Sequence, residues 1–245
     1  KEYCMGGESV FTDAMAHVLK WMAWSRTDIN ATLGRGQMYV ISYAAVRSLL
    51  TASGCAADWT ARSILDVGAG DGNVTATALE PLLDVTALQP IVTTECSSPM
   101  AKCLRTRGYI CIETTDLNTV DTELRKYATP KITSSTSSSI STKPTYDFIS
   151  VFNVLDRADK PQSLLYDIKH LLTPNIGRCV IAVVLPFCPF VENGQLQNKP
   201  KEDLNMNGGR CMEKASYERA VDVMITNVFE PSGFVVHAWT KTPYI

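Results

Sequence analysis

Acidic and polar side chains lie at the ends of three apolar segments of this chain, where strands of an α/β sheet would end. They are Asp66 and Asp71 beside a glycine-rich segment, Glu95 after a second apolar segment, and Asn153 and Asp156 after a third. Ligands of open α/β sheets bind at the carboxyl ends of the strands, so we expect these side chains to surround one site. Their carboxylates can accept hydrogen bonds from sugar hydroxyls and from ring N–H groups.

The segment 64–72, ILDVGAGDG, passes from an apolar strand into a glycine-rich loop and then into a helix. Such a loop presents backbone N–H groups to a nucleotide-like ligand. Its G-x-G-x-G spacing differs from the G-x-G-x-x-G of dinucleotide binders, and its acidic residues favour a sulfonium cofactor with an ammonium group over a pyrophosphate. The segment therefore predicts a site for S-adenosylmethionine, with these cofactor-binding residues: Asp66, Gly68, Gly70 and Asp71.

Two further carboxylates are candidates for binding the nucleoside part of that cofactor. Glu95 ends the second expected strand, where a carboxylate can accept hydrogen bonds from both ribose hydroxyls. Asp116 follows the third expected strand, near the expected adenine position, although an ordinary loop carboxylate is an equally good interpretation.

The polar residues after the fourth expected strand are candidates for the reaction itself. Asn153 closes that strand, and Asp156 and Arg157 follow at once. In the doubly wound methyltransferase fold this strand end faces the methyl group that is transferred. Asp159 is better placed than Asp156 to cap the helix expected from Pro161, which leaves Asp156 available for chemistry.

Alternating strands and helices are expected to position these residues. Apolar runs predict strands at 63–67, 91–95, 109–112, 146–152, 178–185 and 233–239, and helices from 72 and at 97–107, 161–172 and 212–229. This order predicts an α/β fold with a doubly wound, mostly parallel, Rossmann-like sheet over residues 61–245. An N-terminal helical extension over 1–60 precedes it, and its amphipathic segment 8–24 packs on the domain or forms a lid over the cofactor.

Two segments interrupt this alternation. Residues 132–145 are rich in Ser and Thr and cannot bury apolar area, which predicts a flexible, solvated insertion. Residues 187–211 form a long stretch without periodicity, and such stretches in compact domains are commonly functional. Because this second segment follows the fifth expected strand, we expect it to form a wall of the substrate site.

The overall composition excludes several classes of protein. The chain has 245 residues, is 45% hydrophobic and carries a net charge of −2, so it can bury one good core but offers no basic field to nucleic acid. No apolar run is long enough to span a membrane. Eight cysteines without a C-x-x-C pair and three histidines make a metal site unexpected, and we expect reduced thiols. The chain starts at Lys1 without a methionine, which is compatible with the removal of an upstream segment.

Several longer runs resemble one family. They are LGRG at 33–36, FNVLDR at 152–157, LPFCPFVEN at 185–193 and the terminal pair Pro243-Tyr244. With the glycine loop and Thr94-Glu95, they are similar to the methyltransferase-like protein 9 (DREV) family of protein-histidine N-pros methyltransferases over residues 30–245. The Ser/Thr-rich insertion and the end at Ile245, where a final antiparallel strand would be expected, depart from the family pattern.

The resemblance implies a class I S-adenosylmethionine-dependent methyltransferase that modifies the pros nitrogen of histidine in His-x-His motifs and releases S-adenosyl-L-homocysteine. Asn153 is expected to fix the amino-acid end of the cofactor. Arg35 is a candidate to clamp the cofactor carboxylate, with an ordinary turn arginine as the alternative. The remaining candidates are a cofactor and substrate contact at Tyr244 and substrate contacts at Pro186, Phe187 and Phe190.

Asp156 is the expected catalytic residue, assisted by Asn153. Neutral imidazole has one proton and one lone pair, and the protonated nitrogen cannot attack. A carboxylate that accepts the N–H of the tele nitrogen would leave the pros nitrogen free and would stabilise the imidazolium that forms. The alternative acceptor is a small imidazole compound such as carnosine, because its attacking atom would be the same.

The expected partners follow from this assignment. They are proteins or peptides that contain His-x-His motifs, without nucleic acid and without stable membrane insertion, and we expect the chain to act as a monomer. The resemblance implies an intracellular location, in the endoplasmic reticulum or the mitochondrion.

Overall fold

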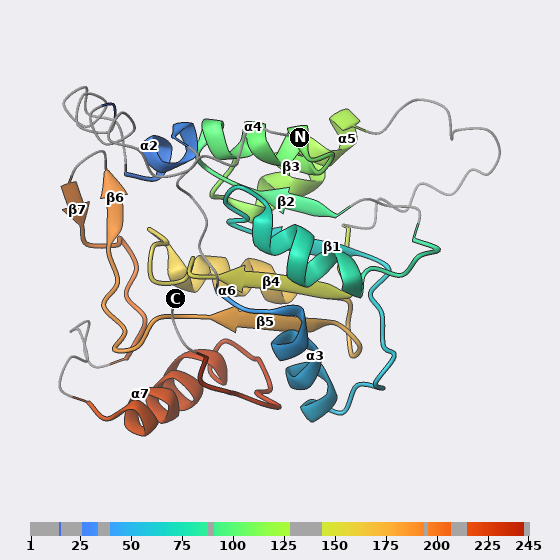
Figure 1. Ribbon diagram of the computed structural model, residues 1–245. Coiled ribbons are helices and arrows are strands. Elements are labelled where there is room, and N and C mark those ends of the chain that lie inside the picture. The colour runs from blue at the N-terminus through green and yellow to red at the C-terminus, as the bar shows by residue number, and fades with distance from the viewer. Residues whose placement is uncertain are drawn as a thin grey trace.

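The computed structural model describes residues 15, 26–33, 40–87, 91–127, 144–193, 196–206 and 215–242. Their centre is a five-stranded parallel sheet with the strand order β3-β2-β1-β4-β5. Its strands are β1 (Ile64–Val67), β2 (Val92–Thr94), β3 (Ile110–Ile112), β4 (Phe148–Phe152) and β5 (Arg178–Ala182). Figure 1 shows them stacked in this order from top to bottom. The expected doubly wound α/β fold is therefore confirmed.

The sheet is buried on both faces, which explains why its strands are apolar runs without alternation. Every residue of β1 and β4 is buried. One face packs against α6 (Pro161–Leu171), α7 (Tyr217–Met224) and η3 (Leu117–Thr119). The other packs against α3 (Tyr43–Ala52), α4 (Ser98–Thr106) and the π-helix η1 (Thr75–Leu79), and the short 3-10 turn η2 (Glu80–Leu82) follows η1.

The strand register aligns the carboxyl ends of the central strands. Val67, the last residue of β1, pairs with Thr94 of β2 on one side and with Val151 of β4 on the other. The loops that leave these three strands therefore begin next to each other. The topology reverses between β1 and β4, which is the usual position of the ligand site in such sheets.

The remaining described elements lie around this core. They are α2 (Arg26–Thr32), α5 (Val120–Tyr127), the π-helix η5 (Ile225–Phe229), and the antiparallel pair β6 (Val191–Asn193) and β7 (Leu196–Asn198). In Figure 1, α2, β6 and β7 lie at the left, beyond the ends toward which β4 and β5 point. None of the described helices is long and apolar enough to cross a membrane.

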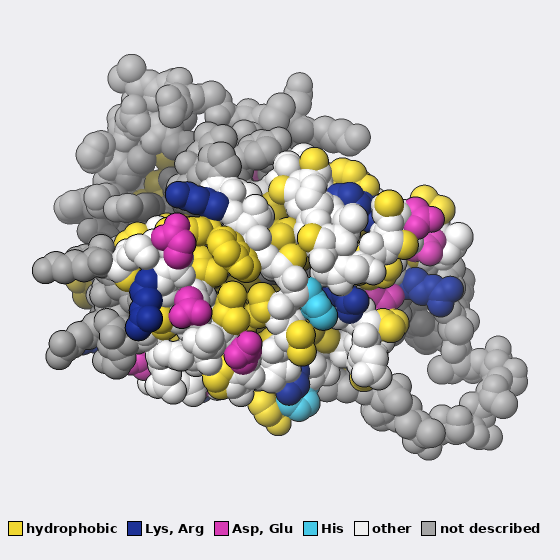
Figure 2. Space-filling model, turned by 90° about the horizontal axis from the view of Figure 1, so that it is seen from below, with side chains coloured by type: hydrophobic (Ala, Val, Ile, Leu, Met, Phe, Trp, Pro, Cys, Tyr) yellow, Lys and Arg dark blue, Asp and Glu magenta, His cyan; other side chains and the backbone are white. Residues whose placement is uncertain are grey.

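The C-terminal part differs from the expectation. The strand expected at 233–239 is wrong, because residues 234–242 lie in no regular element, and among the described strands β5 pairs with β4 alone. The helix expected at 212–229 is observed from Tyr217, and its second half is the π-helix η5. Val235 and Trp239 are exposed, and Figure 2 shows hydrophobic side chains reaching the surface on the face over α7. A segment with apolar side chains does not form a β-strand unless a neighbouring strand pairs with it.

Three other expectations involve the termini, the insertion and the cysteines. The helix expected at 8–24 lies outside the described residues except for Met15, and so do residues 132–143 of the insertion. Cys188 is disulfide-bonded, so the expectation of reduced thiols is wrong for this residue. The free thiols among the described residues include Cys55, Cys96, Cys111 and Cys179.

Candidate active site

The glycine loop after β1 leaves one side of its backbone open. Gly68, Gly70 and Gly72 all have positive φ angles, a conformation that residues with a side chain rarely adopt, which explains the G-x-G-x-G spacing. A Cβ on Gly68 would collide with the side chain of Val154. A Cβ on Gly70 would meet nothing within 4 Å. The loop therefore packs against the turn after β4 at Gly68, and its backbone can be approached at Gly70.

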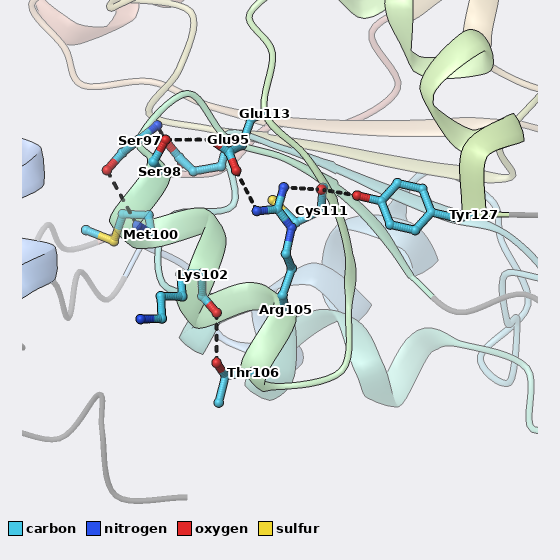
Figure 3. Close-up of polar contacts among 10 residues, drawn as sticks. All are labelled: Glu95, Ser97, Ser98, Met100, Lys102, Arg105, Thr106, Cys111, Glu113 and Tyr127. Atoms are coloured by element: carbon cyan, nitrogen blue, oxygen red, sulfur yellow. Dashed lines mark hydrogen bonds and ion pairs between the residues drawn. The ribbon is translucent and has the colours of Figure 1, made fainter.

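Glu95 holds the glycine loop from the β2 side. Its Oε2 accepts a hydrogen bond from the backbone N–H of Gly70 at 2.9 Å, and its Oε1 accepts one from the N–H of Ser97 at 2.9 Å. Figure 3 shows the second bond at the start of α4. A carboxylate has about four acceptor positions, so these bonds leave room for hydroxyl donors. Glu95 thus lies against the loop, where a ribose ligand is expected.

Asp66 supports the loop from inside the protein. The side chain is 2% exposed, and its two oxygens accept hydrogen bonds from Thr75 at 2.6 Å and Ser150 at 2.7 Å. Burial raises the pKa of this carboxyl to about 6, against the lowering effect of the two hydroxyls. Asp66 therefore links β1 to β4 and η1. Its direct contact with a cofactor stays a prediction.

Asp71 and Asp116 form local turn contacts. The side chain of Asp71 accepts a hydrogen bond from the N–H of Asn73 at 2.9 Å. Its Oδ2 lies 4.0 Å from Nη2 of Arg107. Asp116 is exposed and caps η3 by accepting a bond from the N–H of Asn118 at 3.0 Å. These contacts match the alternative interpretation of Asp116 as a loop carboxylate. The cofactor roles of both residues stay predictions.

The turn after β4 carries two buried polar atoms for which the described residues supply no hydrogen-bond partner. Asn153 has a φ of 55° and a buried Nδ2 that finds no hydrogen-bond acceptor among the described residues. Asp156 is 5% exposed, and its buried Oδ1 has no hydrogen-bond donor within the described part of the chain. Buried polar groups are normally hydrogen-bonded, so unpaired ones call for an explanation. A ligand that offers an acceptor to Asn153 and an N–H to Asp156 would satisfy both.

The segment that follows β5 lies against Asp156. The N–H of Phe190 donates to the carbonyl oxygen of Asp156 at 2.9 Å. The guanidinium of Arg157 lies 4.0 Å from the centre of the Phe190 ring and 3.6 Å from Oε1 of Glu192. Residues predicted to form a wall of the substrate site are therefore fixed next to the expected catalytic carboxylate.

Further along, the same segment is anchored to α6, and this overturns the expected helix cap. The N-cap residue of α6 is Lys160, with no side-chain cap bond, and not Asp159. Asp159 instead accepts hydrogen bonds from the backbone N–H and the side chain of Lys201. Glu202 accepts bonds from the N–H and hydroxyl of Ser163 in the first turn of the helix. A carboxylate distant in sequence thus satisfies a helix N–H group that was expected to have a local partner.

The predicted substrate contacts in this segment fall into different environments. Phe187 is 2% exposed and belongs to the hydrophobic core, so little of its surface can face a substrate. Pro186 follows a cis peptide bond and is exposed, and Phe190 is half-buried. Arg35 and Tyr244, predicted to contact the cofactor, lie outside the described residues.

Sequence reasoning missed the contribution of α2. Asp28 accepts a hydrogen bond from the hydroxyl of Ser97 at 2.6 Å, next to Glu95. The hydroxyl of Thr27 donates to Glu192 at 3.0 Å, on the side of Asp156. The helix therefore contacts both halves of the site, and Figure 1 shows it between α4 and β6. No local pattern could have identified these contacts, since each joins residues far apart in the sequence.

Comparison with known proteins shows the family. The sequence model of the DREV methyltransferases matches residues 9–129 and 126–245. The chain belongs to the DREV methyltransferase family. Membership of this family does not by itself identify the acceptor of the methyl group.

Solved structures show only distant similarity to this DREV-family chain. It is 17% identical to the N-methyltransferase NodS from Bradyrhizobium japonicum WM9, solved with S-adenosyl-L-homocysteine, with a TM-score of 0.36 over 56% of each chain. It is also 16% identical to a chain of the complex between the Haloferax volcanii Trm112 methyltransferase activator and the putative methyltransferase. That match has a TM-score of 0.40 and covers 65% of this chain and 60% of that chain. The chain thus spans less than two thirds of these structures, and the likeness carries no argument about function.

The described residues of this DREV-family protein fit S-adenosylmethionine. The backbone is open at Gly70, and the carboxylate beside it retains acceptor positions for ribose hydroxyls. Beyond the loop, the buried amide of Asn153 has a donor to offer to an amino-acid group. Among the described residues, no group of His, Cys, Asp and Glu could hold a metal ion.

Proposed function

We propose that this protein is an S-adenosylmethionine-dependent methyltransferase that modifies the pros nitrogen of histidine in His-x-His motifs of proteins. The observation that carries the proposal is the buried Oδ1 of Asp156, which has no hydrogen-bond donor among the described residues. It lies on the turn that packs against the glycine loop through Val154. The cofactor side and the acceptor side of the site are therefore in contact.

On the cofactor side, the chain binds and orients. Glu95, which accepts the N–H of Gly70, would also accept hydrogen bonds from the ribose hydroxyls. The buried amide of Asn153 would donate to the amino-acid end of the cofactor. When bound, S-adenosylmethionine supplies an electrophilic methyl group on a sulfonium. Transfer needs close approach of a lone pair in line with the bond that breaks, so positioning supplies much of the rate.

On the acceptor side, Asp156 selects the tautomer of the imidazole. Its Oδ1, which has no donor among the described residues, would accept the N–H of the tele nitrogen, so that the lone pair lies on the pros nitrogen. The pros nitrogen would form the new N–C bond as the S–CH3 bond of the sulfonium breaks, with S-adenosyl-L-homocysteine as the leaving group. The ring then carries a positive charge, which the Asp156 carboxylate stabilises until the tele proton is lost to water. A histidine tautomer with its proton on the pros nitrogen would place no donor at Oδ1 and no lone pair toward the methyl group.

The experiment that tests the proposal compares three acceptors with isotopically labelled cofactor: a His-Ala-His peptide, a peptide with a single histidine, and carnosine. We expect label in the His-Ala-His peptide, with fragmentation and comparison with methylhistidine standards assigning it to the pros nitrogen. Label in carnosine alone would favour the small-molecule alternative. Label on the tele nitrogen would contradict the role of Asp156.

A further inference from the structure

We propose that Arg157 is a positioning residue that orients the Asp156 carboxylate and leaves Oδ1 as the single oxygen available to the acceptor. The inference rests on the proposed function of Asp156. Arg157 Nε donates a hydrogen bond to Oδ2 of Asp156 at 3.1 Å, while the buried Oδ1 receives no hydrogen bond from any described residue. The two oxygens of one carboxylate are therefore in different environments, and the arginine makes the difference.

The guanidinium is held by groups from both sides of the site. Besides Asp156, it contacts the face of the Phe190 ring at 4.0 Å and Oε1 of Glu192 at 3.6 Å. Glu192 in turn accepts a hydrogen bond from Thr27 of α2. A planar guanidinium held between an aromatic ring and two carboxylates has little freedom to rotate, which a flexible lysine would retain. Arg157 is 41% exposed, so these contacts, and not burial, fix its position.

This constraint matters because the terminal torsion of an aspartate is broad and roughly two-fold. Without a partner on Oδ2, the carboxylate could turn and present either oxygen at varied angles. With Oδ2 hydrogen-bonded to Arg157, Oδ1 is the only carboxylate oxygen of Asp156 left to accept the imidazole N–H, and its direction is fixed.

A purely structural role for Arg157 makes a different prediction. The arginine could simply tie the 190–192 segment to the turn after β4, with no effect through Asp156. Its removal would then loosen this segment, and the loss of activity would add to any loss caused by a change at Asp156. If Arg157 acts through Asp156, the two losses are not additive.

The test is a double-mutant cycle on the full chain with Arg157→Gln, Asp156→Asn and the combined variant. The measurements are kcat and KM for a His-Ala-His peptide, with calorimetry for S-adenosyl-L-homocysteine binding. Arg157→Gln should lower kcat about 10- to 100-fold with unchanged affinity for S-adenosyl-L-homocysteine. The combined variant should be no slower than Asp156→Asn. Arg157→Lys should recover part of the loss, because it restores the charge but not the planar contact.

Arg125→Gln is the matched control, since Arg125 bonds Asp121 at 3.0 Å on α5, on a helix that carries no residue of the proposed site. It should leave both kcat and KM unchanged. If Asp156→Asn is too slow to measure, the same cycle is run on peptide affinity in the presence of S-adenosyl-L-homocysteine, where non-additivity is again expected.

The outcomes separate the inference from the proposed function. A multiplicative loss in the combined variant, a normal kcat for Arg157→Gln, or a lowered melting temperature with weaker S-adenosyl-L-homocysteine binding would overturn the positioning role. Full activity of Asp156→Asn would instead overturn the proposed role of Asp156.

Discussion

At the scale of single residues, the distribution of hydrogen-bond partners separates the carboxylates of the site. Asp66 uses both oxygens inside the protein, and Glu95 uses both to brace the loops around the cofactor side. Asp156 keeps one buried oxygen to which no residue in the described ranges donates a hydrogen bond. The amino-acid type is the same or similar in each case, so the chemistry of each residue is decided by its neighbours.

Asp156→Asn should lower kcat for a His-Ala-His peptide about 100- to 10,000-fold, because the amide is a weaker acceptor and cannot stabilise the imidazolium. Binding of S-adenosyl-L-homocysteine, measured by calorimetry, should change by less than about threefold. Asp84→Asn, in the turn after η2, is the control and should behave as wild type. The mechanism would be wrong if the Asp156 variant kept full activity.

The raised pKa of Asp66 predicts a pH dependence of stability. Its pKa is raised from 3.8 to about 6 in the folded protein, so the folded state binds this proton more readily than the unfolded state between those values. The contribution of Asp66 to the free energy of unfolding therefore falls as the pH rises through that range and stays low above it. Asp66→Asn removes this titration. Urea unfolding at pH 4.5, 5.5 and 7 should show the wild type losing stability relative to the variant as the pH rises, and a constant difference would refute the shift.

At the scale of elements, α2 joins the two halves of the site through two hydrogen bonds. Loss of one such bond costs about 1 kcal/mol, or about fivefold in an equilibrium constant. Asp28→Ala should therefore weaken cofactor binding by about three- to tenfold, because it releases Ser97 beside Glu95. Thr27→Val should instead raise the KM for the peptide, because it releases Glu192.

The control for both α2 variants is Thr32→Val, because Thr32 is an exposed residue at the end of the same helix and is not among the residues of the proposed site. Calorimetry with S-adenosyl-L-homocysteine and steady-state kinetics with a His-Ala-His peptide separate the two effects. Equal behaviour of all three variants would show that neither hydrogen bond of α2 contributes to cofactor or peptide binding.

At the scale of the whole molecule, the segment after β5 belongs to the hydrophobic core as well as to the site. Phe187 packs in the same core as the buried residues of β1, β4 and α6. Phe187→Ala should lower the free energy of unfolding by about 3–5 kcal/mol, as measured by urea unfolding. The milder Phe187→Leu should remain folded and keep the KM for a His-Ala-His peptide. If Phe187→Leu raised the KM without lowering the stability, Phe187 would have to be a substrate contact, as the sequence predicted.

Much of the fold could be predicted from local patterns. The five parallel strands are apolar runs that alternate with helical segments, and the three glycines of the loop occupy backbone conformations that favour glycine. The expected strand at 233–239 failed because pairing depends on a neighbouring edge, which no local run of residues specifies.

The sequence by itself determined the α/β fold, the glycine loop and the polar residues that leave the central strands, because each depends on residues close together in the chain. Only the tertiary structure decided which of these residues has a partner. The cap of α6 by Glu202, the contacts of α2 and the unpaired oxygen of Asp156 all depend on segments far apart in the sequence. Hydrogen bonding and burial are set by such distant neighbours, so residues of one type can take different roles.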